Sequence, residues 1–169
     1  MAKGRVVLVV LALLALVTGC FGEPRVGVIG EEHTLLLPFE ASKFLGYFQK
    51  NGLEVSLDWA NGTELISLLN FSKYKAAVVD GTTARKIEEF SKEWVKLCKV
   101  AVKTKGGKPI KGKQFFLLIR KELLREPEET VVLVKGWNSG VDALKDPAVV
   151  YALTGEEAVR GYRFYSCTP

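Results

Sequence analysis

A turn of polar residues, Asp80-Gly81-Thr82-Thr83, offers the clearest binding chemistry in this 169-residue chain. It follows an apolar run over 76–79 and precedes a helix expected over 84–93. A buried strand, a tight polar turn and a helix N-terminus, in this order, place backbone N–H groups and hydroxyls where open α/β sheets bind ligands. We expect Thr82 or Thr83 to cap the helix.

The same arrangement, a polar turn directly after an expected strand, recurs after 25–30, 53–59 and 130–134. Each of these turns brings side-chain hydroxyls or amides to a strand end. At every position the alternative is a cap or turn residue that touches no ligand. The further candidate ligand contacts are Thr34, Asn61, Thr63, Asn138 and Ser139.

His33 is the only histidine of the chain and lies in a loop on the same side as these turns. It either contacts a ligand or is an ordinary surface histidine. One histidine and two cysteines of uncertain redox state, Cys98 and Cys167, argue against a zinc site. No nucleophile is singled out for a Ser-His-Asp or Cys-His arrangement. We therefore expect no catalytic residue, no metal and no cofactor, and a protein that is not an enzyme.

The N-terminus has the pattern of a lipoprotein signal peptide. Lys3 and Arg5 precede an unbroken apolar run over 6–17, which is about half of the ~20 residues that a membrane-spanning helix needs. The run closes with LVTGC, which resembles the lipobox of prokaryotic lipoproteins. The resemblance implies cleavage before Cys20 and a lipid on its thiol, and thus a protein attached to the extracytoplasmic face of the cell membrane. The alternative is an ordinary signal peptide with a buried cysteine.

The other two cysteines are Cys98 and Cys167. Outside the cytoplasm a disulfide between them is allowed, and two free buried thiols are the equal alternative. We expect a signal peptide over 1–19, the lipidated cysteine and its tether over 20–24, and one α/β domain over 25–169.

The composition is that of a globular protein, with 48% hydrophobic and 25% charged residues. The formal net charge is +5. The densest group of lysines, over 103–113, is interleaved with glycines, which favours a solvated loop over a nucleic-acid-binding face. We expect no nucleic-acid partner.

Strands and helices alternate through the first half of the domain, and a hairpin follows them. This order predicts an α/β fold, a three-layer αβα sandwich around a mixed, mostly parallel sheet. Right-handed crossovers would bring the ends of the first three strands to one edge. The expected strands are 25–30, 53–59, 76–79, 94–103, 114–120, 130–134 and 161–167, and the expected helices are 38–50, 64–69, 84–93, 121–125, 141–144 and 147–159.

The order and spacing of the segments over 25–140 resemble type 2 periplasmic solute-binding proteins, in particular the alkanesulfonate, taurine and thiamine-precursor group. The best-matching run is KFLGYFQKNGLEV over 43–55. The strand over 114–121 resembles the one in which that family's chain leaves its first lobe, and 130–140 resembles the first strand and ligand turn of the second lobe.

The resemblance implies a first lobe over about 25–120, a reduced second part over about 121–169, and a periplasmic-binding-protein-like fold. It also implies a protein that captures a small molecule for an ABC-type permease, held at the membrane by the lipid on Cys20. Family members usually carry a full second lobe. A one-lobe surface lipoprotein that binds a protein partner is therefore the alternative, and an enzyme on the same fold is a third interpretation.

Overall fold

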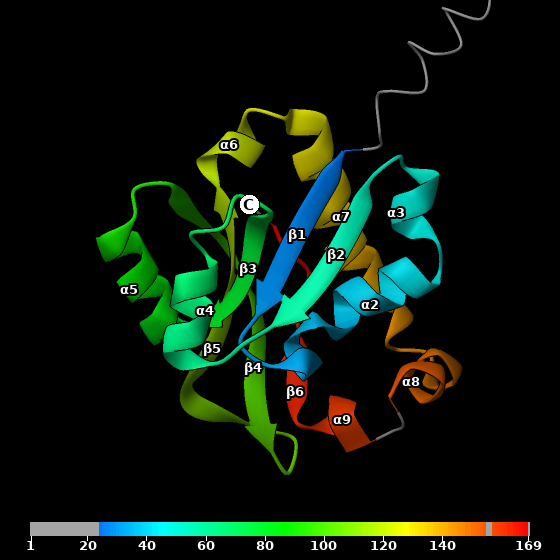
Figure 1. Cartoon of the computed structure of the whole chain (residues 1–169). Helices are drawn as coiled ribbons and strands as arrows, with labels where there is room; N and C mark the ends of the chain where they lie inside the picture. The colour runs from blue at the N-terminus through cyan, green and yellow to red at the C-terminus, as the bar shows by residue number, and fades with distance from the viewer. Residues whose placement is uncertain (1–23, 155–156, 169) are drawn as a thin grey trace, which may run out of the picture.

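The computed structural model describes residues 24–154 and 157–168, so the expected signal peptide over 1–19 and the expected lipid site at Cys20 lie outside the described residues. A six-stranded sheet runs through the molecule in the order β2-β1-β3-β5-β4-β6 (Figure 1). The strands are β1 (Arg25–Gly30), β2 (Glu54–Trp59), β3 (Tyr74–Asp80), β4 (Trp94–Lys105), β5 (Lys108–Arg120) and β6 (Tyr162–Phe164).

The sheet is mixed, but the expectation that it is mostly parallel is wrong. β1 pairs in parallel with β2 and β3, whereas β5 runs antiparallel to β3 and β4, and β6 runs antiparallel to β4. The cause is the β4–β5 hairpin, which needs no helical crossover and places β5 between β3 and β4. The parallel part of the sheet is thus its N-terminal half, where β1, β2 and β3 alternate with helices.

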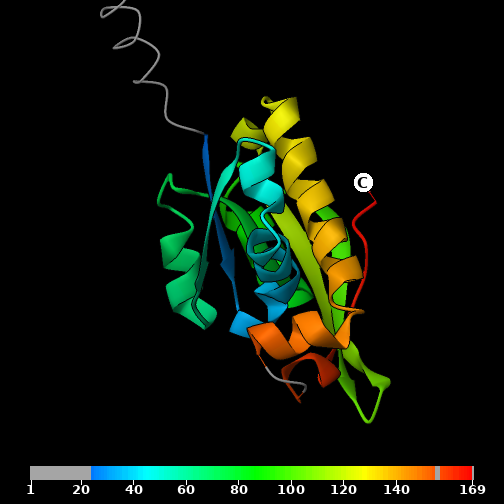
Figure 2. The ribbon, with the colours of Figure 1, turned by 90° about the vertical axis from the view of Figure 1, so that its right-hand side faces the viewer.

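Helices cover both faces of the sheet because the central strands bury both of their faces. Val26 and Val28 of β1 belong to one apolar core, and Ile29 belongs to the other. The first core is covered by α2 (Leu37–Phe44), α3 (Tyr47–Lys50) and α7 (Pro127–Ala143), and the second by α4 (Gly62–Leu68) and α5 (Gly81–Phe90) (Figures 1 and 2). The remaining helices are η1 (His33–Leu36), α6 (Lys121–Leu124), α8 (Pro147–Leu153) and α9 (Glu157–Arg160). In the described part of the chain, no helix is long and apolar enough to cross a membrane.

The strand expected over 130–134 and the ligand turn expected over 135–140 are both wrong, because these residues lie inside α7. Several valines close together favour a strand locally. The helix forms instead because the buried residues recur with helical spacing. Leu133, Trp137 and Val141 are four residues apart, on the face that covers the sheet.

Helix α7 packs closely against α2, and Gly140 makes this contact feasible. A Cβ atom at Gly140 would lie 1.7 Å from the carbonyl oxygen of Pro38, so the two helix backbones touch. The buried Ser42 hydroxyl of α2 donates a hydrogen bond to the carbonyl oxygen of Gly136, and the rings of Phe39 and Trp137 meet edge to face with centroids 5.0 Å apart. Figure 2 shows α7 along the sheet with α2 beside it.

Other boundaries also differ from the sequence prediction: the strand expected over 161–167 is only Tyr162–Phe164, and the helix expected over 141–144 is the end of α7. The helix expected over 38–50 is broken between α2 and α3 at Gly46, whose φ of 74° is left-handed. The basic loop expected over 104–113 is mostly strand, because β4 and β5 continue to a tight turn at Gly106 and Gly107.

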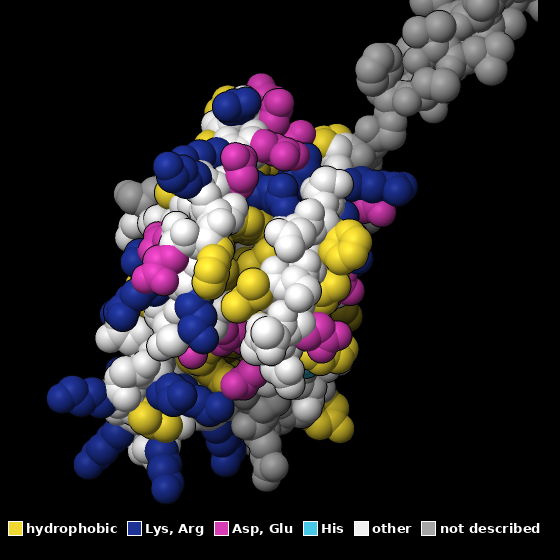
Figure 3. Space-filling view, turned by 60° about the vertical axis from the view of Figure 1, so that its left-hand side comes forward, with side chains coloured by type: hydrophobic (Ala, Val, Ile, Leu, Met, Phe, Trp, Pro, Cys, Tyr) yellow, Lys and Arg dark blue, Asp and Glu magenta, His cyan; other side chains and the backbone are white. Residues whose placement is uncertain are grey.

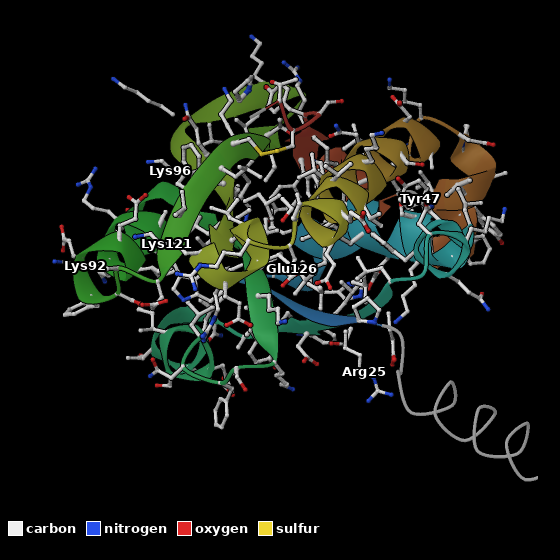
Figure 4. All side chains as sticks on the ribbon, turned by 90° about the horizontal axis from the view of Figure 1, so that it is seen from above. Arg25, Tyr47, Lys92, Lys96, Lys121 and Glu126 are labelled. Atoms are coloured by element: carbon white, nitrogen blue, oxygen red, sulfur yellow. A yellow bond between two sulfur atoms is a disulfide. The ribbon has the colours of Figure 1, made fainter. Side chains whose placement is uncertain are left out.

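The C-terminal segment is tied to β4 and α7. A disulfide joins Cys98 and Cys167, with their Cα atoms 5.6 Å apart (Figure 4). The Asn138 side chain donates to the carbonyl oxygen of Cys167 (3.1 Å) and accepts from its N–H (2.6 Å). The indole N–H of Trp137 donates to the carbonyl oxygen of Tyr165 at 2.8 Å. These contacts hold the segment that follows β6 against β4 and α7.

Candidate functional site

The carboxyl ends of β1, β2 and β3 lie together at one end of the strands (Figure 1). We call the turns that follow these strand ends, residues 31–34, 59–63 and 80–83, the ligand edge. The three strands are parallel, so their carboxyl ends point in the same direction. The start of β1, at Arg25, lies at the opposite end of the strands, toward the top of Figure 1. The turns after these three strands are therefore neighbours, although they lie far apart in the sequence.

The turn after β3 is capped by Asp80. Helix α5 begins at Gly81, and the Oδ1 atom of Asp80 accepts a hydrogen bond from the Thr83 N–H at 2.7 Å. The expectation that Thr82 or Thr83 caps this helix is wrong, because the helix starts about three residues earlier than its sequence pattern predicts. Its first turn includes both threonines, and an aspartate just before the helix reaches the third helical N–H.

Glu31 joins the turn after β1 to the turn after β3. Its half-buried carboxylate accepts a hydrogen bond from the Asp80 N–H at 3.1 Å and one from the Thr83 side chain. Burial raises the pKa of Glu31; the Thr83 hydrogen bond opposes this rise, and the negative charge of Asp80 adds to it. The arrangement places two carboxylates side by side at the ends of neighbouring strands.

Glu32 connects the ligand edge to β4 and β6. Its carboxylate pairs with the Lys103 ammonium at 3.3 Å and accepts a hydrogen bond from the Tyr162 hydroxyl. The Lys103 Nζ atom lies 5.6 Å from the centroid of the Tyr162 ring. Burial and, after it, the hydrogen bond to Glu32 raise the pKa of Tyr162, so this phenol stays a hydrogen-bond donor.

An aromatic surface stands beside these carboxylates. The ring of Trp59, at the end of β2, is 60% exposed and meets the imidazole of His33 edge to face, with centroids 4.9 Å apart. The Nε2 atom of His33 lies 2.8 Å from Oε1 of Glu40. An exposed indole is the best of the aromatic rings for a cation to lie against.

The other predicted residues of the ligand edge are present there as expected from the strand order. Thr34 lies in η1, directly after β1, and is partly exposed. Asn61 precedes α4 as its N-cap residue without a side-chain capping bond, and Thr63 lies in the first turn of this helix; both are exposed. The structure therefore brings these three residues to the same edge as Asp80.

Asn138 and Ser139 are not in a turn that follows a strand. Both lie within α7, because the strand expected before them is helical. The Asn138 amide binds the backbone of Cys167, which gives this side chain a structural contact. The reason for expecting these two residues at a ligand site therefore fails.

Gly81 and Thr82 line a separate surface hollow of about 380 Å³, next to the first turn of α5. The lining includes Arg85 and Lys96, and the Lys96 ammonium lies 3.9 Å from the Glu88 carboxylate. Figure 3 shows Lys and Arg side chains gathered toward the lower end of this face, with carboxylates closer to its centre. The hollow is polar, and its lining residues are Gly81, Thr82, Arg85, Glu88, Lys96, Gly112, Gln114 and Phe116.

Sequence reasoning missed most of the charged and aromatic groups of the ligand edge. A signal for Glu31 and Glu32 was present, since they follow β1 directly, and Trp59 ends β2 in the same way. Lys103 and Tyr162 carried no such signal, because their contacts with Glu32 span 71 and 130 residues of sequence.

The ligand edge is suited to bind positive charge. Glu31, Glu32 and Asp80 contribute carboxylates, and the Lys103 ammonium pairs with that of Glu32. Among the residues that the structure describes, no group of three or more His, Cys, Asp or Glu side chains could hold a metal ion. Hydrogen-bond acceptors with net negative charge beside an exposed indole fit an organic cation.

Comparison with solved structures identifies the fold. A gene product of Candida albicans, which defines a new family of proteins with the generic periplasmic binding protein fold, superposes with a TM-score of 0.64 at 8% sequence identity. The match covers 85% of this chain and 82% of that chain. A Bordetella bronchiseptica protein has a TM-score of 0.35 and 19% identity over 48% of this chain and 29% of that chain, so no argument rests on it.

The expected periplasmic-binding-protein-like α/β fold is thus confirmed, and at this identity the similarity shows the fold alone. It gives no support to the finer assignment to the alkanesulfonate, taurine and thiamine-precursor group. The sequence matches no protein-family model, and no curated protein is significantly similar to it.

Proposed function

We propose that this protein is a non-catalytic, lipid-anchored extracytoplasmic binding protein that captures a small solute with a cationic group, such as an amine. The observation that carries the proposal is the cluster of Glu31, Glu32 and Asp80 at the ligand edge. In open α/β sheets, ligands bind beyond the carboxyl ends of the strands, which is where these carboxylates lie. The periplasmic-binding-protein-like fold supports a binding role.

The charge of the ligand edge also bears on the ligand classes that the sequence resemblance implied. A sulfonate beside Glu31 and Asp80 would meet two carboxylates, and like charges a few ångströms apart repel each other. An amine-bearing heterocycle of the thiamine-precursor type would instead pair with them and place its ring against Trp59. We therefore favour amines and amine-bearing rings over simple alkanesulfonates.

The proposed location rests on the lipobox-like sequence that ends at Cys20. The disulfide between Cys98 and Cys167 supports it, because disulfides persist mainly in oxidising compartments. From this position the protein would deliver its ligand to an ABC-type permease in the same membrane. Cys20→Ser should release the protein from membranes, and continued tight membrane association of the variant would refute the anchor.

Thermal unfolding with a panel of small molecules tests the ligand class. A ligand at 100 times its Kd adds about 2.7 kcal/mol, which raises the Tm of a domain of this size by about 5–10 °C. We expect such shifts with amines, and not with sulfonates of matched size. Glu31→Gln should weaken the shift, whereas Glu89→Gln, on the exposed surface of α5, should leave it unchanged. Shifts with sulfonates alone, or with no compound, would refute the proposal.

The alternative function is that of a surface lipoprotein whose partner is another protein. The observation that favours it is the exposure of large apolar side chains, among them Phe44 (60%), Leu45 (45%) and Trp59 (60%). Such a protein would show no small-molecule shift, and Phe44→Ala or Trp59→Ala would weaken its cross-linking to one defined membrane protein.

A further inference from the structure

Two Asn-X-Ser/Thr tripeptides flank helix α4. Asn61-Gly62-Thr63 begins it, and Asn70-Phe71-Ser72 follows it in the turn that leads to β3. This tripeptide, with any residue but proline in the middle, is the acceptor sequence for N-linked glycans. Because α4 connects the two edges of the sheet, Asn61 lies at the ligand edge and Asn70 near the opposite edge (Figure 1).

The side chains of these two asparagines are available for modification, unlike those of the other two asparagines in the chain. Asn51 donates from Nδ2 to the carbonyl oxygen of Tyr47 at 2.7 Å, and Asn138 binds the backbone of Cys167 through both its amide atoms. Neither has Ser or Thr two residues later. Within the described residues, the amides of Asn61 and Asn70 make no hydrogen bond, and both residues are exposed.

Exposed aromatic rings accompany both acceptor sequences. Phe71, the middle residue of the second one, is 58% exposed, and Trp59, two residues before Asn61, is 60% exposed. Large apolar side chains in water are unfavourable, and the C–H face of a sugar at Asn70 would cover Phe71. Asn61 is the N-cap residue of α4, with φ −100° and ψ 155°, and its side chain makes no capping hydrogen bond to the helix that follows.

We propose that Asn61 and Asn70 carry N-linked glycans at the outer face of the cell. The donor is a lipid-linked oligosaccharide. The Nδ2 atom loses one proton and forms a bond to C1 of the first sugar, while the bond between C1 and the lipid phosphate breaks and its electrons leave with the phosphate, which takes up the proton. No oxidation or reduction takes place. A glycan at Asn61 would exclude a direct role of that side chain in ligand binding.

The proposal rests on the extracytoplasmic location proposed above. Its test uses the full-length protein purified from the membranes of its own host, digested and analysed by mass spectrometry. The peptides with Asn61 and Asn70 should carry the mass of a glycan. Thr63→Ala and Ser72→Ala keep each asparagine but destroy the acceptor sequence, so each should remove one glycan, whereas Asn51→Gln should change nothing.

A second measurement, protease digestion of intact cells, separates the failure of this proposal from that of the location. A protein that is cleaved from outside but has an unmodified Asn61 or Asn70 overturns the proposal for that residue alone. A protein that is protected inside the cell and unmodified overturns both the glycans and the location. A glycan that persists in Thr63→Ala or Ser72→Ala would show that the attachment lies elsewhere.

Discussion

Removal of the disulfide between Cys98 and Cys167 should cost the fold much of its stability. The bond closes a loop with a sequence separation of 69 residues. In the chain-entropy model, opening a loop of this length raises the conformational entropy of the unfolded chain, which stabilises the unfolded state by about 4.4 kcal/mol at 25 °C. We expect the double variant Cys98→Ala with Cys167→Ala to lose about this amount, because each alanine alone would leave a free thiol.

Thermal and guanidinium unfolding of the chain from residue 24 onward measure the loss. The Tm should fall by about 9–18 °C, given a shift of about 2–4 °C per kcal/mol for a domain of this size. Wild type in a reducing agent is the matched control and should approach the double variant, which itself should be insensitive to the agent. In guanidinium, the variant should have a lower midpoint and a larger m-value than the oxidised wild type, because the unfolded chain without the crosslink exposes more surface.

Loss of the disulfide should also affect the ligand edge. Ligand binding by the reduced protein therefore tests whether the disulfide has a local role there besides its effect on global stability. The bond holds the segment that follows β6, and β6 supplies the Tyr162 hydroxyl to Glu32. The reduced protein should therefore bind a cationic ligand more weakly even where it is still folded. A stability loss below about 1 kcal/mol would refute the loop-closure reasoning, and unchanged ligand binding would refute the coupling.

Three substitutions, two of them with a matched control variant, test other parts of the fold. Asp80→Ala should cost about 1 kcal/mol in urea unfolding through loss of the helix cap, and Thr82→Ala less than half of that; equal losses would contradict the assignment of the cap. Gly140→Ala should cost roughly 2–3 kcal/mol by overpacking, whereas Gly161→Ala, where a Cβ meets no atom within 4 Å, should be nearly neutral. Burial raises the folded-state pKa of Glu31 above 4.5, so the folded protein loses stability as the pH rises from there through the raised value. Glu31→Gln removes this loss, and unfolding free energies measured across that range should increasingly favour the variant; parallel curves would refute the shift.

The N-terminal half of the fold was predictable because its signals are local. The run over 76–79 is apolar at every position, as a strand buried on both faces requires, and β3 is such a strand. Alternation of strands and helices then fixes parallel pairing and brings the strand ends together. For this reason Asp80 and Asn61 could be assigned to the same edge from sequence alone.

The C-terminal half was less predictable because tertiary contacts decide it. The valines of 130–134 favour a strand, yet the spacing of Leu133, Trp137 and Val141 buries one helical face against the sheet. The antiparallel pairing of β5 with β3 joins segments that the hairpin brings together, and no local pattern specifies it. The contact of Tyr162 with Glu32 depends on that pairing and on the position of β6 in the sheet. It could therefore not be predicted from the sequence pattern of each segment alone.

The close contact at Gly140 bears on how distant relatives of this protein can be recognised. The fold is shared with a Candida albicans protein at 8% identity, so very different sequences can form this architecture. A side chain at 140 would collide with backbone rather than with another side chain, and no substitution elsewhere in α2 removes a carbonyl group. Surface residues can therefore be substituted and core side chains can repack during evolution, whereas glycine is retained at this position. In an alignment of diverged homologues, Gly140 and the paired Cys98 and Cys167 should be among the last columns to vary, and they are better markers of descent than overall identity.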